Sequence, residues 1–202
     1  MGRPNRFKLT GVPQLLTQRG HNRLPCFLDG ADYEFFMQSL WDSAEQAGTR
    51  IHATVLLPQA YWIMASPSTP DGVGRMVQRI GRCYVRYCNA KYRREGTLWA
   101  GRYQACLVEP SPEAMTECAQ FLQSTPGRSG VTARGRTWPW TYFDDELPGA
   151  TDQGLDDDAY DRIAMLVRMG LVIGSESFRR RIAAEAGVRT EPGVRGRPRK
   201  SR

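Results

Sequence analysis

The spacing of apolar and polar residues predicts a domain that contains both strands and helices. Three stretches, at 11–20, 50–58 and 60–66, have the apolar, β-branched and aromatic content expected of strands. The segment DGADYEFFMQSLWDSAEQAG (29–48) instead carries apolar residues at helical spacing, begins with an aspartate that can cap a helix and ends at a glycine. Residues 73–94 predict a second, longer helix.

The remaining elements of this part of the chain complete a recognisable order. TLWAGRYQACLVEP (97–110) predicts a further strand or hairpin. Ser111 can cap a helix that we expect to run to about residue 124 and to stop before Pro126. The order strand, helix, strand, strand, helix, strand, helix is typical of an α+β fold with a ferredoxin-like antiparallel sheet and helices packed against it. We assign this domain to residues 1–147.

The end of the chain differs in composition from the first domain. LDDDAYDRIAMLVRMG and SESFRRRIAAEAG predict two short helices, which we expect to form a small helical unit at 155–187. The tail at 188–202 is rich in Pro and Gly and holds six basic residues against one acidic residue. Because it offers little that could be buried, we expect it to be disordered when free.

The second helix has two chemically different faces. At about 100° per residue, Arg75, Arg79, Arg82 and Arg86 fall in one narrow stripe. Val73, Met76, Val77, Ile80, Tyr84 and Tyr87 lie on the opposite side. We therefore expect one face of this helix to pack and the other to be positively charged.

Charge and cysteine usage narrow the class of protein. The chain has 28 Lys and Arg against 21 Asp and Glu, a formal net charge of +7 and a pI near 9.4, which favours a polyanionic partner such as nucleic acid. Its five cysteines form no C-x-x-C pair, so neither a disulfide framework nor a zinc site is expected. No apolar run is long enough to span a bilayer. These features predict a cytoplasmic, unexported protein.

Several stretches together resemble the REP-associated tyrosine transposases, a branch of the single-strand HUH transposases. The matching segments span most of the chain and are GVPQLLTQRGHNRLPCF, RIHATVLLP, RCYVRYCNAKYRREGTLWAGRY, TPGRSGV, GSESF and GRPRK. The resemblance implies an HUH-type fold. It also implies a strand with two histidines, separated by one apolar residue, that hold Mg²⁺ or Mn²⁺. A helix is implied to carry a nucleophilic tyrosine and, one turn later, an Asn or Gln that completes the metal site.

This chain departs from the family pattern at all four chemical positions. Alignment of LPQAYWIM places Ala60 and Trp62 where the resemblance implies histidines. Alignment of QFLQSTPGRSG places Phe121 at the nucleophile and Thr125 at the helical ligand. Alanine and phenylalanine carry no donor atom, and the indole N–H offers no lone pair to a metal. We therefore expect no metal cofactor, no intact catalytic residue, and an apolar contact between these side chains. The two histidines present, His21 and His52, are interpreted as non-ligands.

The resemblance implies that DNA binding can persist without these groups, since the family recognises short hairpins with single-stranded flanks. The arginines that could line such a surface are Arg19, Arg23, Arg75, Arg79, Arg82, Arg86, Arg93, Arg94 and Arg102. For the 75–86 stripe, a solvated helix face is the alternative. Tyr92, Trp99 and Tyr103 could stack unpaired bases or simply pack in the core.

The basic tail offers a second DNA-binding element. Arg195-Gly196-Arg197-Pro198 resembles an AT-hook core, which places arginines in the narrow minor groove of A·T tracts. Arg199 and Lys200 continue the basic run. A generic basic tail is the competing interpretation.

Three functional hypotheses follow. The first is a nucleoid-associated DNA-binding protein of this family that no longer cleaves or joins DNA. The second is an active nuclease or transposase with a relocated nucleophile, such as Tyr61 or Tyr103, and a metal held by Asp144 or Asp145. The third is a protein-interaction adaptor that uses the acidic segment 152–161. The DNA target and the choice between monomer and dimer stay open.

Overall fold

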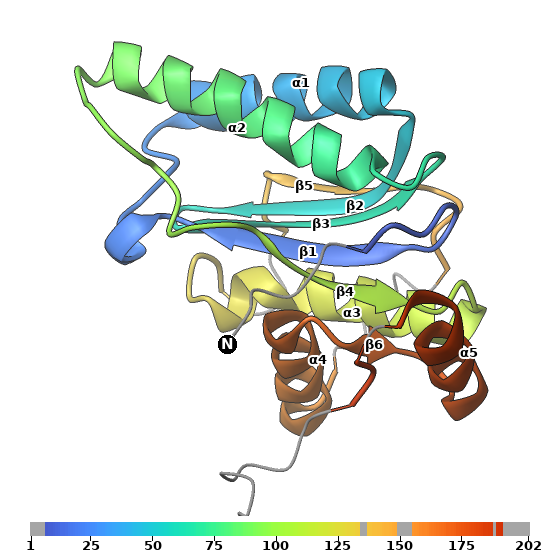
Figure 1. Ribbon diagram of the computed structural model, residues 1–202. Helices are drawn as coiled ribbons and strands as arrows, with labels where there is room; N and C mark the ends of the chain where they lie inside the picture. Colours follow the sequence, from blue (N-terminus) through green and yellow to red (C-terminus); the bar gives the residue numbers. More distant parts are fainter. Residues whose placement is uncertain (1–6, 134–136, 149–154, 188, 192–202) are drawn as a thin grey trace, which may run out of the picture.

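The computed structural model describes residues 7–133, 137–148, 155–187 and 189–191. Its centre is a six-stranded sheet in the order β5-β2-β3-β1-β4-β6 (Figure 1). The neighbouring strands are antiparallel except for the parallel pair β4 and β6. The strands are β1 (Gln14–Arg19), β2 (Thr49–Leu57), β3 (Ala60–Pro67), β4 (Gln104–Val108), β5 (Thr141–Phe143) and β6 (Val172–Ile173).

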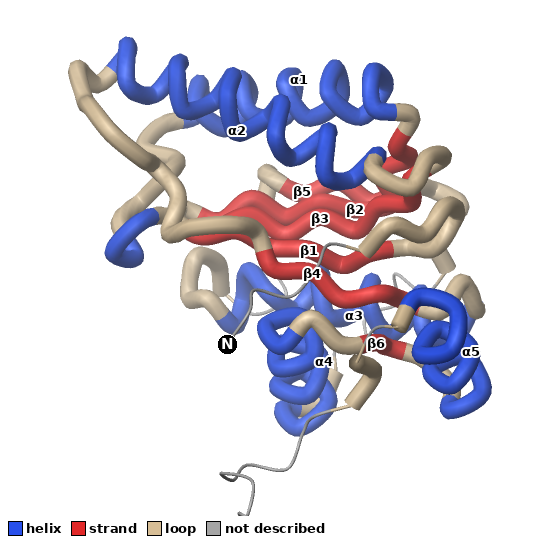
Figure 2. The backbone as a smooth tube through the Cα atoms, in the orientation of Figure 1, coloured by secondary structure: helices blue, strands red, loops and turns tan. Residues whose placement is uncertain are grey.

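Helices cover both faces of the sheet, and the predicted α+β class is confirmed (Figure 2). One face is covered by α1 (Gly30–Ala47) and α2 (Gly72–Lys91), and the other by α3 (Pro112–Arg128) and α4 (Asp157–Met169). A short 3-10 turn (His21–Arg23) follows β1, and α5 (Glu176–Ala186) lies beyond β6. From β1 to β4 the elements have the β-α-β-β-α-β order of the ferredoxin-like motif.

Alternation along β3 divides the interior into two cores. Tyr61 and Ile63 pack with the α1 and α2 side chains, whereas Trp62 and Met64 pack with those of α3 and α4. This follows from the strand geometry, because successive side chains point to opposite faces of a sheet. The identity of residue 62 therefore affects only the α3 and α4 side.

The helix boundaries follow from capping residues, with one correction. Asp29 and Asp32 form a capping box at the start of α1, and Gly48 ends that helix in the left-handed conformation with φ 59°. The expected stop before Pro126 is wrong, because α3 continues to Arg128. Pro126 lies in the last turn, so its missing N–H costs one hydrogen bond, to the Leu122 carbonyl oxygen, and only two helical residues follow it.

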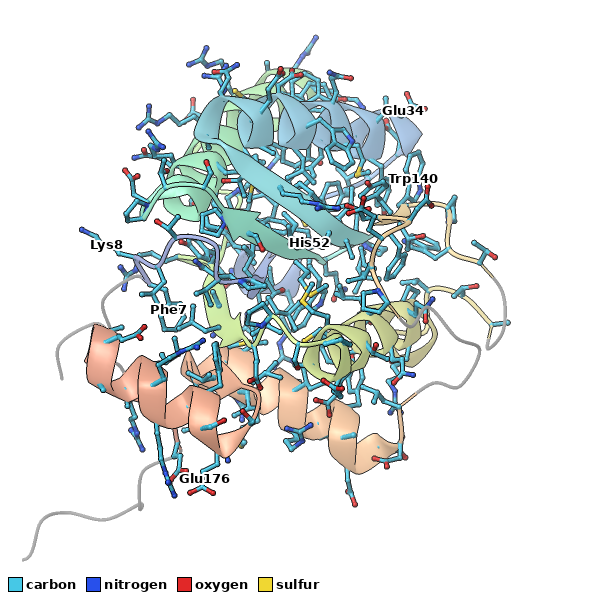
Figure 3. All side chains as sticks on the ribbon, turned by 90° about the vertical axis from the view of Figure 1, so that its right-hand side faces the viewer. Phe7, Lys8, Glu34, His52, Trp140 and Glu176 are labelled. Carbon is cyan, nitrogen blue, oxygen red and sulfur yellow. The ribbon has the colours of Figure 1, made fainter. Side chains whose placement is uncertain are left out.

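The C-terminal helices are attached to the main sheet. The segment expected to form a small helical unit does contain two helices, and β6 between them pairs with β4. Ile163 and Val167 of α4 are fully buried in the same core as Phe121. Phe7, labelled in Figure 3, packs against the cluster that joins β6 to α5. Among the described residues, each helix is too short or too polar to cross a membrane.

Candidate nucleic-acid interface

The four altered positions lie on two elements that face each other, β3 and α3. The rings of Trp62 and Phe121 meet edge to face, with centroids 4.9 Å apart and planes at 74°. Phe121 is fully buried and Thr125 is 1% exposed. Ala60 lies two residues before Trp62 on the same face of β3 and lines an adjoining cleft. The expected contact between the aromatic replacements is therefore present in the fold.

Tyr160 of α4 completes this aromatic cluster and was not predicted as part of the site. Its ring stacks on Phe121 with centroids 4.5 Å apart, and its hydroxyl lies 3.3 Å from Thr125 Oγ1. The Arg128 guanidinium lies 4.5 Å from the centroid of the same ring. Burial raises the pKa of Tyr160, which favours the neutral phenol. The helical spacing of Tyr160, Ile163 and Val167 is the sequence signal that could have identified this apolar face of α4.

These residues do not fit a divalent cation. The Ala60 side chain has no atom that can ligate a metal, and the Trp62 indole nitrogen carries a proton and offers no lone pair. The Thr125 hydroxyl donates a 2.7 Å hydrogen bond to the Phe121 carbonyl oxygen, and one hydroxyl oxygen alone cannot hold a divalent cation. Over the part of the chain that the structure describes, no three or more His, Cys, Asp or Glu side chains gather into a metal-binding group.

The two histidines lie on other elements than the altered positions, on β2 and in the 3-10 turn after β1. His52 of β2 shares a 2.7 Å hydrogen bond with Ser66 Oγ through its Nε2 atom. Burial and the nearby Arg50 lower the pKa of His52, which favours the neutral ring. His21 is exposed in the 3-10 turn that follows β1.

A cleft of about 760 Å³ opens beside this cluster, between the sheet and α4. Trp62 and Ala60 form the part of its wall that belongs to β3. Arg19 and Arg102, which the sequence predicted for a DNA-binding surface, also line the cleft. The α4 wall was not predicted, and its residues follow a helical repeat that puts them on one face. They are Asp158, Asp161, Arg162, Ala164, Met165 and Arg168.

The cleft is positively charged. Four arginines and two aspartates line it, the arginines being Arg19, Arg102, Arg162 and Arg168. Arg162 is already paired with Glu117 of α3. Among the ion pairs of the described residues, none involves Arg19 or Arg168. These two guanidinium groups can therefore pair with an anion at no loss of an internal ion pair.

Strand register places the groups of the sheet wall next to one another. Arg19 of β1 lies directly opposite Ala60, and Thr17 lies opposite Trp62. On the other side of β1, Thr17 lies opposite Gln104. Side chains directly opposite on antiparallel strands share a face. The cleft therefore presents an aromatic ring, a guanidinium and two neutral polar groups on one continuous surface.

The other predicted arginines divide between two regions. Arg75, Arg79, Arg82 and Arg86 are exposed on α2, which covers the opposite face of the sheet from the cleft. Arg75 also pairs with Asp71 at 3.5 Å and donates to Thr69. The structure thus confirms that the stripe is exposed but does not place it in the cleft.

Arg23 lies in the 3-10 turn after β1, and Arg93 and Arg94 lie in the loop that follows α2. The His21 backbone N–H donates to the Leu98 carbonyl oxygen at 2.8 Å, and the Ala100 N–H donates to the Arg19 carbonyl oxygen at 2.9 Å. These bonds join the loop after α2 to the end of β1, where Arg19 begins the cleft wall. The tail residues Arg195, Arg197, Arg199 and Lys200 lie outside the described residues.

The aromatic residues first considered for base stacking have structural roles. Trp99 is 6% and Tyr103 is 9% exposed, and both belong to the core under α1 and α2. The Tyr92 hydroxyl donates to Asp32 at 2.8 Å. Trp140, labelled in Figure 3, stacks on Tyr33 of α1 with ring centroids 4.7 Å apart. Trp62 is instead the aromatic side chain that lines the charged cleft.

Comparison with known proteins supports the fold. No family model and no curated protein matches the chain. A structure of the REP-associated tyrosine transposase bound to a REP hairpin is similar, with a TM-score of 0.59 and 16% identity over 70% of this chain and 82% of that one. A candidate transposase from Deinococcus radiodurans R1 matches with a TM-score of 0.42 and 16% identity over 56% of this chain and 91% of that one. The chain therefore has the fold of the REP-associated tyrosine transposase, the family that its sequence segments resemble.

Proposed function

We propose that this protein binds DNA hairpins with single-stranded flanks and neither cleaves nor joins them. The shared fold supports a DNA partner, because the similar transposase was solved with a REP hairpin. The net charge of +7 and the arginine-lined cleft supply the electrostatic attraction that a polyanion needs. Neutralised phosphates release counterions, so the affinity should fall steeply with salt.

The observation that carries the proposal is the contact between Trp62 and Phe121 beside this cleft. The resemblance implies a metal ligand at the first position and a nucleophilic tyrosine at the second. Both are carbon-rich rings here, and they pack against each other in the interior of the molecule. Phosphodiester cleavage by this route needs a nucleophilic oxygen and a cation that polarises the phosphate. Neither can be supplied by these two side chains.

The geometry weighs against a relocated nucleophile. Tyr61 is 1% exposed, faces α1 and α2, and donates its hydroxyl to Gln18 Oε1 at 2.8 Å. Tyr103 is buried on the same side. Asp144 accepts hydrogen bonds from Arg50 near the start of β2, whereas Tyr61 pairs with Leu56 near the end of that strand. The separation of Tyr61 from Asp144 along β2 supports the proposal over a nucleophile relocated to Tyr61.

Part of the acidic segment 152–161, which the adaptor hypothesis invokes, lines the cleft. Asp158 and Asp161 lie beside Arg162 and Arg168, so this region of α4 has mixed charge. The proposed A·T-tract contact by Arg195 and Arg197 rests on the sequence motif alone.

A titration of the full chain against a labelled hairpin with a single-stranded flank tests the proposal. We expect specific binding whose affinity falls with salt by about 0.7–0.9 log units per log unit of salt for each phosphate contact. The double variant Arg19→Gln/Arg102→Gln should bind more weakly and with a shallower salt slope. The control is Arg180→Gln, an exposed arginine of α5, which should bind as the unchanged protein does. DNA affinity that is absent or independent of salt would overturn the proposal and favour the adaptor.

A further inference from the structure

We propose that the cleft holds one unpaired nucleotide of the flank, with its base stacked on Trp62 and its phosphate paired with Arg19 and Arg102. This inference rests on the proposed DNA binding and assigns it a specific subsite. The ligand class is a single-stranded nucleotide rather than duplex DNA.

The position of Trp62 carries the base-stacking part of the inference. Its side chain is half-buried and lines the cleft, and its ring is held by the edge-to-face contact with Phe121. A ring held in this way loses little side-chain entropy when a base stacks on it. The small side chain of Ala60, two residues earlier on the same face, leaves open space beside the indole. Aromatic rings accept any of the bases, because each base has a π-face.

The register of β1 and β3 places a phosphate-binding group at a suitable separation. Arg19 is opposite Ala60 and is therefore a diagonal neighbour of Trp62. Diagonal neighbours on an antiparallel pair lie roughly 7–8 Å apart, a distance that long side chains and one nucleotide can bridge. Arg102 lines the same cleft from the segment before β4. A guanidinium can pair with phosphate through two parallel N–H groups.

The opposite wall orients the ligand. Asp158 and Asp161 in the first half of α4 repel a phosphate, whereas Arg168 near the end of that helix attracts one, so the anion is favoured beside the arginines and away from the two aspartates. The volume of about 760 Å³ is within the range of roughly 300–1,000 Å³ that is usual for small-molecule sites. A single nucleotide fits such a space, whereas a duplex does not enter it. The cleft thus distinguishes the flank from the stem.

The test compares two hairpins that share one stem, one blunt and one with a single-stranded flank. We expect the unchanged protein to bind the flanked hairpin more tightly. Trp62→Leu should reduce this preference by roughly 5- to 150-fold, the range that stacking of one base supplies. Trp62→Phe keeps an aromatic ring and should restore most of the preference. Affinity for the blunt hairpin should be unchanged in both variants.

A second variant and a direct readout distinguish loss of the subsite from misfolding of Trp62→Leu. Ala60→Leu fills the space beside the indole and leaves Trp62 in place, so it should also remove the preference for the flank. A 2-aminopurine base in the flank should lose fluorescence on binding to the unchanged protein and keep it with Trp62→Leu.

The outcomes separate this inference from the proposed function. Equal flank preference and equal quenching in the unchanged protein, Trp62→Leu and Ala60→Leu would overturn the subsite while leaving DNA binding intact. Failure of the unchanged protein to bind either hairpin would overturn both. Arg180→Gln again serves as the control, because it removes a charge from α5 and should leave the preference unchanged.

Discussion

Trp62 of β3 and Phe121 of α3 pack edge to face with their ring centroids 4.9 Å apart. Phe121 in turn stacks on Tyr160 of α4 at 4.5 Å, so three aromatic rings link the sheet to both helices on this face. The end of α3 holds α4 as well, because Arg128 pairs with Asp157 at 2.5 Å and donates to the Leu155 carbonyl oxygen. The positions altered from the family pattern therefore support the wall of the cleft.

Truncation of the middle ring should destabilise the fold. Phe121→Ala removes a fully buried side chain from between Trp62 and Tyr160 and leaves a cavity. We expect a loss of about 3–5 kcal/mol in the free energy of unfolding, measured by urea denaturation. Met169→Ala, at the exposed end of α4, is the control and should change stability by less than about 1 kcal/mol. A similar small change for Phe121→Ala would show that the ring is not packed as described.

A second network joins the start of α1 to the end of α2 and should make stability depend on pH. Lys91 Nζ lies 2.7 Å from Asp29 Oδ1 and 2.8 Å from Asp32 Oδ1. The Leu28 N–H and the Tyr92 hydroxyl donate to the other oxygen of Asp32. Burial alone would raise the pKa of Asp32, but the hydrogen bonds from Lys91 and its neighbours outweigh it and lower that pKa.

The sign of the effect follows from this lowered pKa. The folded state keeps Asp32 ionised after the unfolded chain has bound a proton, so the stabilisation is present above about pH 4 and is lost as the pH falls through the folded pKa. Asp32→Asn should lower the free energy of unfolding at pH 7 and flatten its decline in acid, as measured by urea denaturation across pH. The exposed Glu34 of the same helix, changed to Gln, should keep the original profile. An unchanged acid profile in Asp32→Asn would contradict this account.

Two glycines should respond to alanine in opposite directions. Gly174 follows β6 with φ 145°, and an added Cβ would lie 2.6 Å from the Glu109 Cβ, so Gly174→Ala should be destabilising. Gly81 lies within α2 with open space around an added Cβ, and Gly81→Ala should gain about 0.5–1 kcal/mol through helix propensity. Thermal unfolding of the two variants tests both signs. Stabilisation by Gly174→Ala would mean that the β6 to α5 connection differs from the structure.

The arginine stripe of α2 should act differently from the cleft. Because it lies over the opposite face of the sheet, Arg82→Gln/Arg86→Gln should change the affinities for blunt and flanked hairpins by the same factor. If both side chains contact phosphates, the salt slope should fall by about 0.7–0.9 for each. Binding measured at several salt concentrations separates these effects. Selective loss of the flanked hairpin would place the single strand on α2 instead of in the cleft.

The sequence predicts the elements of the first domain well, because their signals are local. Apolar, β-branched and aromatic content identifies β2 and β3, and Asp29 and Gly48 mark the ends of α1. The contact between Trp62 and Phe121 was expected from the family resemblance, which supplies the long-range pairing that periodicity lacks.

The missed features depend on how distant segments pack. Arg162 and Arg168 reach the cleft, and Tyr160 reaches the ring of Phe121, only because α4 docks on the sheet. The sequence near β3 gives no sign of this docking. The strand β6 has two residues, too few for a periodic signal, and exists through its pairing with β4. The sequence predicts a helix that stops before Pro126, but α3 ends at Arg128. The sequence does not show that Pro126 falls in the last turn, where a proline is tolerated.

The most direct measurement of the central claim is a search for cleavage under conditions where binding is demonstrated. Full-length protein is incubated with a flanked hairpin and Mg²⁺ or Mn²⁺, and the products are separated under denaturing conditions while a parallel sample measures the bound fraction. The account predicts a bound hairpin that remains intact, with no DNA covalently attached to the protein. A covalent adduct or a specific cut in the flank would contradict it.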